Sequence, residues 1–252
     1  MIPLHDDNPT VHRAWATLFL ILLCGLVYFF VQPTPFASTG ADGAFEFRHA
    51  AVPTEVVHGR PLNACEVVEG ITRQKASSTV CNQPGSLAPY AQGKRTRLAV
   101  ISSIFLHASI IHLLGNMLYL WIFGNNIEDR MRPLAFLIFF LVGGIVATMA
   151  HILADPASTT PVVGASGAVA AVMGAYFIWY PKAKVSTLVF VLILRIRAFW
   201  LLLVWLVLQF FTGSNSHVAW VAHVAGFVFG AGVALIIGPA KAQAPLSSSP
   251  AI

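Results

Sequence analysis

A single serine in the second half of the chain lies in a setting that suits a nucleophile. Ser166 stands in the stretch Gly164-Ala-Ser-Gly-Ala168, where a polar segment gives way to a long apolar one with no charge before Lys182. A serine hydroxyl is a weak nucleophile unless a base takes its proton. His223 is the only histidine in the last apolar segment, so it is the candidate base. The pair predicts acyl transfer by a Ser–His dyad.

Two further polar residues suit the stabilisation of the oxyanion that such an attack creates. His112 and Asn116 are four residues apart in an apolar segment, so a helix would place both on one face. A tetrahedral intermediate needs hydrogen-bond donors. The two side chains and the backbone N–H of Ser166 can supply them, and the N-terminal end of a helix beginning near Ser166 would add partial positive charge.

Each of these residues also has a plainer interpretation. A serine at a helix start is usually an N-cap, an intramembrane histidine more often packs and hydrogen-bonds, and His112 with Asn116 could simply join two helices. Catalysis is favoured because all four are expected at one shallow depth below the outer surface, where polar groups within spans are functional candidates by default. We expect His107, His151 and His217 to be structural or solvated.

The composition places these residues in a membrane protein. Of the 252 residues, 57% are hydrophobic and 10% are charged, whereas a soluble domain carries about 25% charged residues. The net charge of +5 requires no nucleic-acid partner, because the basic residues lie in short loops beside apolar segments. The sequence has no metal-type cluster of cysteines or histidines, and we expect no metal and no cofactor.

The apolar segments predict an all-α polytopic membrane protein with six transmembrane helices. Segment 181–198 is read as an interfacial excursion, because Arg195 and Arg197 would each cost at least about 2.5 kcal/mol in the bilayer centre. The spans are expected over residues 14–32, 102–124, 133–154, 163–180, 199–212 and 218–237. The chain then divides into a cytoplasmic N-terminal segment (1–13), a first span (14–32), a large extracytoplasmic loop (33–97), a catalytic membrane core of five spans (98–238) and a disordered cytoplasmic tail (239–252).

The orientation follows from the distribution of lysine and arginine. One side collects the basic residues of the short loops, whereas the loops at 155–161 and 212–217 have none. The positive-inside rule therefore places both termini in the cytoplasm and loop 33–97 outside, as in a bacterial inner-membrane protein. Cys65 and Cys81 of that loop would then face an oxidising compartment, where they could form a disulfide or remain two unpaired thiols.

Small residues offer a way to bring the nucleophile and the base together. The segment after the serine carries Gly164 and Gly167, and the last apolar segment contains Gly226-Phe-Val-Phe-Gly230, a GxxxG pattern. Such faces let helix backbones pack closely in lipid. Gly164 and Gly167 are expected to serve close approach by the last helix and by a substrate backbone.

Four stretches, in this order, resemble the signatures of the rhomboid intramembrane serine proteases. The match runs from about Phe105 to Gly230 at the spacing of that family. The stretches are Phe105-Leu-His-Ala-Ser-Ile-Ile-His112-Leu-Leu-Gly-Asn116-Met, Gly124-Asn-Asn-Ile-Glu128-Asp-Arg130, Gly164-Ala-Ser166-Gly167 and Ala222-His223-Val-Ala-Gly226-Phe-Val-Phe-Gly230. The resemblance implies a six-helix fold, a water-filled cavity open to the outside, a Ser166–His223 dyad, and His112 and Asn116 at the oxyanion. It implies single-span membrane proteins as substrates.

The chain departs from the family in two places. Loop 33–97 contains no tryptophan, so the Trp-Arg pair of many members is missing. Ala170 stands where some members place an aromatic residue that supports the histidine, and no acidic residue is available for a triad, so the group that orients His223 is not identified. The alternative function is a catalytically inactive relative that binds membrane clients. A histidine-based transporter or haem protein is disfavoured, because His107 and His112 would not share a helix face.

Overall fold

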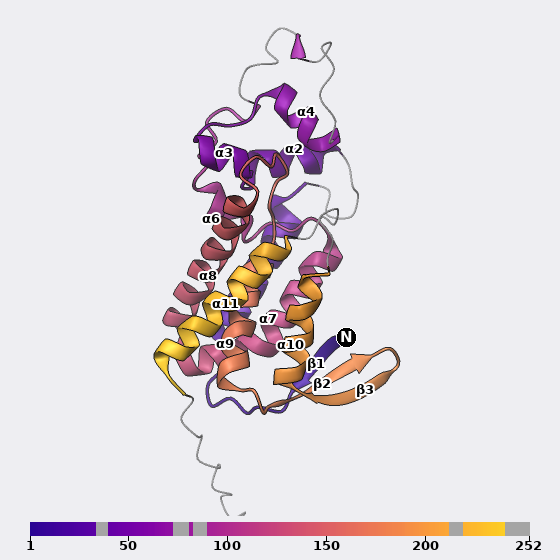
Figure 1. Ribbon diagram of the computed structural model, residues 1–252, viewed down its shortest axis with the longest axis vertical. Coiled ribbons are helices and arrows are strands. Elements are labelled where there is room, and N and C mark those ends of the chain that lie inside the picture. The colour runs from indigo at the N-terminus through magenta and orange to yellow at the C-terminus, as the bar shows by residue number, and fades with distance from the viewer. Residues whose placement is uncertain (34–39, 73–80, 83–89, 212–218, 240–252) are drawn as a thin grey trace, which may run out of the picture.

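A bundle of long helices forms the body of the molecule. The computed structural model describes residues 1–33, 40–72, 81–82, 90–211 and 219–239. Small helices cover one end of the bundle and a three-stranded sheet lies at the other (Figure 1). The bundle helices are α1 (Trp15–Leu26), extended by the π-helical turn η1 (Val27–Val31), α7 (Ile110–Met131), α8 (Pro133–Ala154), α9 (Ser166–Trp179), α10 (Ala198–Gln209) and α11 (Trp220–Ile237).

Helix α9 lies at the centre of this bundle. Every residue from Gly167 to Tyr176 is buried, and the helix packs against α7, α8, α10 and α11. Its small residues explain the position, since alanine and glycine leave room for neighbours on all sides.

The contact between α9 and α11 depends on glycines that face backbone. A Cβ added to Gly226 would meet the Gly167 carbonyl, and one added to Gly230 would meet the Ala171 carbonyl. Gly167 itself was expected to serve the approach of α11, but its Cβ position lies 2.5 Å from the Cβ of Ala147 in α8. Gly167 therefore admits α8 on one side, while its carbonyl contacts α11 on the other.

Among the described residues, two helices, α8 and α11, are long and apolar enough to cross a membrane. Three shorter apolar helical segments accompany them: 15–31, α9 and α10. Helix α7 begins at Ile110 rather than near residue 102, because Ser109 caps it by accepting a hydrogen bond from the His112 N–H at 3.1 Å. It also continues to Met131, beyond the expected end of the span at residue 124.

That continuation has a physical reason in Glu128. Its buried carboxylate accepts hydrogen bonds from the N–H groups of Ala16 and Thr17, at 2.9 and 2.7 Å, and from the Thr17 hydroxyl at 2.8 Å. These are free N–H groups in the first turn of α1, where a negative charge is favourable. Glu128 thus lies within α7 and connects this helix to α1.

A small sheet corrects the expectation of a wholly helical chain. Strands β1 (Ile2–Asp6), β2 (Lys184–Val189) and β3 (Leu192–Arg197) form an antiparallel sheet in that order. The β-branched residues of the 181–198 segment favour strands. The segment therefore forms a hairpin that pairs with the start of the chain. The buried Asp6 carboxylate adds to the attachment, accepting from Asn126 Nδ2 at 2.7 Å and Tyr176 Oη at 2.8 Å.

The region between α1 and α7 has a core of its own. It contains α2 (Gly40–His49), α3 (Pro53–His58), α4 (Ala64–Thr72) and α6 (Ala99–Ser103). The core residues are Phe47, Val52, Leu62 and Val67. A buried ion pair of Lys94 with Glu55 and a disulfide between Cys65 and Cys81 lie in the same region. A bridge between Ala51 and Val162 joins it to the segment before α9.

Candidate active site

Ser166 and His223 face each other across the α9–α11 contact. Ser166 is the first residue of α9, and His223 lies in the first turn of α11. The Ser166 Oγ is 2.8 Å from His223 Nε2, a normal hydrogen-bond length for transferring a proton. The glycine contacts of these two helices set this distance, because any larger side chain there would push the backbones apart.

The turn before Ser166 requires a glycine. Gly164 has φ of +123°, which side-chain-bearing residues rarely adopt, and its N–H donates to the Ser103 carbonyl at 2.9 Å. A Cβ at this position would also lie 2.6 Å from Cε1 of His112. Gly164 therefore allows the His112 ring to approach the nucleophile, and its expected contacts with α11 are not what the structure shows.

A glutamine in α10 holds the other side of the His223 ring. Gln209 Oε1 lies 2.7 Å from His223 Nδ1, and Gln209 Nε2 donates to the Trp205 carbonyl at 2.9 Å. Because Nε2 is held by that carbonyl, Oε1 is directed at the imidazole. A neutral imidazole with its proton on Nδ1 then presents the lone pair of Nε2 to Ser166.

The aromatic support of the histidine also comes from α10. The Trp205 ring lies 6.0 Å from the His223 ring between centroids, tilted by 38°. Ala170 instead takes part in the packing of α9 against α11, because its Cβ lies 3.3 Å from the Cβ position of Gly226. Neither Trp205 nor Gln209 was identified from the sequence. The available signal was a glutamine within an apolar segment, four residues after a tryptophan and hence on the same helix face.

His112 and Asn116 line the cavity into which Ser166 and His223 also open. The cavity has a volume of about 1040 Å³ and is bounded by α7, α9, α10, α11 and the segment before α9. Among the described residues, the Asn116 Nδ2 group is buried and has no hydrogen-bond partner. A buried donor without a partner costs free energy, so this N–H group is available to an oxyanion formed in the cavity.

Three other histidines were expected to be structural or solvated. His107 is 1% exposed, and its ring lies 5.3 Å from that of His112, so it is a buried neighbour of the site. His151 lines the cavity, and His217 lies outside the described residues. Within the described part of the chain, no group of three histidine, cysteine or acidic side chains could hold a metal ion.

Comparisons with known proteins find similarity over the part of the chain that carries these residues. The family model of the rhomboid domain matches residues 94–240. The chain is 33% identical over 91 residues to the presenilin-associated rhomboid-like protein A, mitochondrial, of Danio rerio, covering 35% of this chain and 24% of that protein. It is 31% identical over 99 residues to rhomboid protein 1, mitochondrial, of Saccharomyces cerevisiae (38% and 29%). It is 28% identical over 130 residues to the rhomboid protease GlpG of Yersinia pestis (52% and 44%). The chain thus matches less than half of the length of each of these relatives.

Proposed function

Because the chain belongs to the rhomboid family, as its sequence motifs predicted, we propose that it is an intramembrane serine endopeptidase. Its reaction is the hydrolysis of peptide bonds in transmembrane segments of other membrane proteins, through an acyl-enzyme on Ser166. The observation that carries the proposal is the 2.8 Å separation between Ser166 Oγ and His223 Nε2. The alternative, an inactive client-binding relative, has no need of this alignment.

In the first half of the reaction, His223 Nε2 takes the proton of Ser166 as Oγ attacks the substrate carbonyl. Asn116 Nδ2, the His112 ring and the N–H of Ser166 donate to the resulting oxyanion. The imidazolium then gives its proton to the departing amine. In the second half, His223 takes a proton from water, hydroxide attacks the acyl carbon, and the proton returns to Ser166 Oγ.

Gln209 contributes orientation to this cycle. Its amide oxygen accepts from Nδ1 throughout, which keeps the imidazole in the tautomer that can act as a base. It brings no negative charge, so the site is a dyad with a neutral third group rather than a Ser-His-Asp triad. No acidic residue is required for the mechanism.

The substrate class follows from the position of the cavity among membrane helices. A single-span protein can place a segment beside the bundle, but a helix shields its own carbonyl groups by hydrogen bonding. The substrate must therefore unwind locally at the cut. We expect small or helix-weakening residues there.

The proposal includes a membrane arrangement with six spans, formed by α1 with η1, α7, α8, α9, α10 and α11. Residues 98–238 form the catalytic core, residues 33–97 a large extracytoplasmic loop, and residues 1–13 and 239–252 lie on the cytoplasmic side. The Cys65–Cys81 disulfide favours an oxidising compartment for the loop. A bacterial inner membrane meets these requirements. The expected turn at 212–217 and the expected disordered tail, from residue 240 onward, lie outside the described residues.

A serine-reactive probe and a reporter substrate together test the function. A fluorophosphonate should label the wild-type protein at Ser166 and should not label Ser166→Ala or His223→Ala. The wild type, reconstituted in liposomes, should cleave a single-span reporter within or near its span, as read by mass spectrometry of the fragments. Cleavage by Ser166→Ala would contradict the mechanism. Absence of both labelling and cleavage in a folded wild type would favour the inactive relative.

A further inference from the structure

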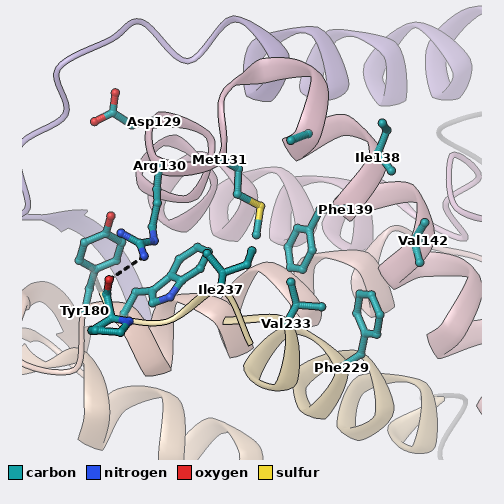
Figure 2. Close-up of a pocket in the computed structure, with 13 residues that line it drawn as sticks. Asp129, Arg130, Met131, Ile138, Phe139, Val142, Tyr180, Phe229, Val233 and Ile237 are labelled. Atoms are coloured by element: carbon teal, nitrogen blue, oxygen red, sulfur yellow. Dashed lines mark hydrogen bonds between the residues drawn. The ribbon is translucent and has the colours of Figure 1, made fainter. Parts of the chain in front are cut away.

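A second cavity lies at the ends of α8 and α11 that are remote from Ser166. It has a volume of about 820 Å³. Figure 2 shows its walls, in which Ile138, Phe139 and Val142 of α8 face Phe229, Val233 and Ile237 of α11. Together with Ala135 of α8, these residues repeat at helical spacing along each helix, so the walls are apolar for about 10–12 Å at 1.5 Å per residue. We refer to this cavity as the α8–α11 groove.

One end of the α8–α11 groove holds a cation. Arg130 Nη2 donates to the carbonyls of Gly238 and Pro239, at 2.9 and 2.8 Å, and the guanidinium carbon lies 4.3 Å from the centroid of the Trp179 ring. The Arg130 Nε group is buried and has no hydrogen-bond partner among the described residues. Both bonded partners are neutral carbonyls, and the Nε–H of this charged group forms no hydrogen bond with them.

The neighbouring carboxylate does not neutralise this guanidinium. Asp129 accepts from the N–H groups of Val11 and His12, at 3.0 and 2.9 Å, and lies 2.7 Å from His12 Nδ1. Figure 2 shows its carboxylate directed away from Arg130. No ion pair of Arg130 occurs within the described parts of the chain. A partly buried charge without a counter-ion is costly, so an anion is expected at this end.

We propose that the α8–α11 groove binds an anionic glycerophospholipid. One acyl chain lies between the apolar walls, and the phosphate accepts from the guanidinium of Arg130. An apolar channel with Arg130 at its polar end matches the two parts of such a molecule, and Asp129, which also lines the groove, is held by Val11 and His12. Basic pockets between membrane helices are a known setting for lipid headgroups, and guanidinium binds phosphate well because its donors are arranged as a fork.

Pro239 lines the groove, so the competing occupant is the chain segment after it. Residues 240–252 read Ala-Lys-Ala-Gln-Ala-Pro-Leu-Ser-Ser-Ser-Pro-Ala-Ile. They contain no acidic side chain and one lysine, so they offer Arg130 no anionic side chain and bring a second cation. Charge complementarity therefore favours the lipid.

Two valines give a matched test of the acyl-chain site. Val142 lines the groove and is 39% exposed, whereas Val228 is 61% exposed and lies outside it. Val142→Trp should fill the groove, and Val228→Trp should add the same bulk elsewhere. Native mass spectrometry of delipidated protein in detergent, with added phosphatidylglycerol, should show one retained lipid for wild type and Val228→Trp. Retention by Val142→Trp should fall at least five-fold, and wild-type-like retention by that variant would overturn the proposal.

The headgroup site is tested with Arg130→Gln and with a neutral lipid. Phosphatidylglycerol should be retained about five-fold more than phosphatidylcholine by the wild type, the ratio for about 1 kcal/mol per basic residue. Arg130→Gln should abolish the preference, and Arg130→Lys should restore part of it. An unchanged preference in a folded Arg130→Gln would overturn the phosphate contact. If Arg130→Gln does not fold, the proposal is tested by the comparison of Val142→Trp with Val228→Trp and by the ratio of phosphatidylglycerol to phosphatidylcholine retained by the wild type.

Two further outcomes would point to another occupant and overturn the proposal. Displacement of the lipid by millimolar glycerol phosphate would indicate a site for free phosphate esters. Lipid retention only after removal of residues 240–252 would indicate that the C-terminal segment fills the groove. All of these measurements report binding, so they remain informative whether or not Ser166 is catalytic.

Discussion

Gln209 Oε1 lies 2.7 Å from Nδ1 of His223, on the side of the imidazole opposite Ser166. This contact places an amide oxygen where many serine hydrolases use a carboxylate. An amide oxygen can hold the tautomer and the direction of the ring without adding a charge to an apolar surrounding. The base is therefore positioned by α10, a helix that contributes no reacting group.

Replacement of Gln209 should separate orientation from substrate binding. We expect Gln209→Leu to lower kcat by about 10- to 100-fold with little change in KM, since positioned general-base catalysis contributes about 10²- to 10⁴-fold. Gln209→Glu keeps an acceptor and should recover much of the rate. Steady-state kinetics on a reporter span measures both. A rise in KM without a fall in kcat would assign Gln209 to the substrate cavity instead.

Removal of the Asn116 carboxamide should affect the transition state alone. Its Nδ2 group is buried without a partner, so it is free to donate when the oxyanion forms. Asn116→Ala should lower kcat by about 10- to 1000-fold and leave KM nearly unchanged. Asn125→Ala, on the same helix but outside the cavity, is the control and should retain wild-type kcat. A variant that only weakened substrate binding would contradict the oxyanion role.

Glycines of α11 should differ sharply in their tolerance of alanine. A Cβ at Gly230 would collide with the Ala171 carbonyl, whereas one at Gly232 has nothing within 4 Å. Gly230→Ala should destabilise the protein by about 2 kcal/mol or more, since overpacking against backbone is not easily relieved. Gly232→Ala should be neutral or stabilising by up to about 1 kcal/mol. Thermal unfolding in detergent compares the two, and equal midpoints would show that the α9–α11 contact can move apart.

The pH dependence of the region between α1 and α7 should reflect Glu66. Arg60 donates to both carboxylate oxygens, at 3.0 and 2.7 Å, and these bonds hold the pKa of Glu66 below its ordinary value of 4.5. A depressed carboxyl pKa stabilises the fold above the unfolded-state pKa, and this contribution is lost as pH falls through the folded-state pKa.

Glu66→Gln tests that sign directly. Amide hydrogen exchange of residues 60–72 should be faster in Glu66→Gln than in wild type at pH 6 to 7. The difference should shrink below pH 4.5 and vanish once Glu66 is protonated in the folded protein. A difference that persisted unchanged at low pH would show that Glu66 acts through shape rather than charge.

The sequence was sufficient to predict the family and the candidate dyad, because these depend on local motifs. Each motif, Gly-Ala-Ser-Gly and Ala-His followed by GxxxG, can be recognised within a few residues. Close packing of the two helices then brings the serine and the histidine together. The predicted bounds of α7 were wrong by several residues. The helix begins where Ser109 caps it, and it ends later than expected because Glu128 contacts α1. The cap is local, but the contact of Glu128 with Ala16 and Thr17 joins residues more than a hundred positions apart and leaves no periodic signal.

Gln209 and the small sheet were missed for the same reason. A glutamine in an apolar helix indicates a polar partner, but only the arrangement of α10 against α11 identifies that partner as His223. Arg195 and Arg197 correctly argued against a span, yet strand formation at 184–197 also depends on pairing of Lys184–Val189 with Ile2–Asp6. The sequence periodicity of either segment alone does not indicate which other segment it pairs with.

The pairing of β1 with β2 has a consequence for the order of events during synthesis. Residues Ile2–Asp6 leave the ribosome well before their partner strand, which begins at Lys184. At about 5–20 residues per second, this strand waits roughly 10–40 s for its neighbour. Strand β1 therefore cannot adopt its final structure until α1, α7, α8 and α9 have been made. A chaperone or insertion factor that holds this segment would delay closure of the sheet without delaying the helices.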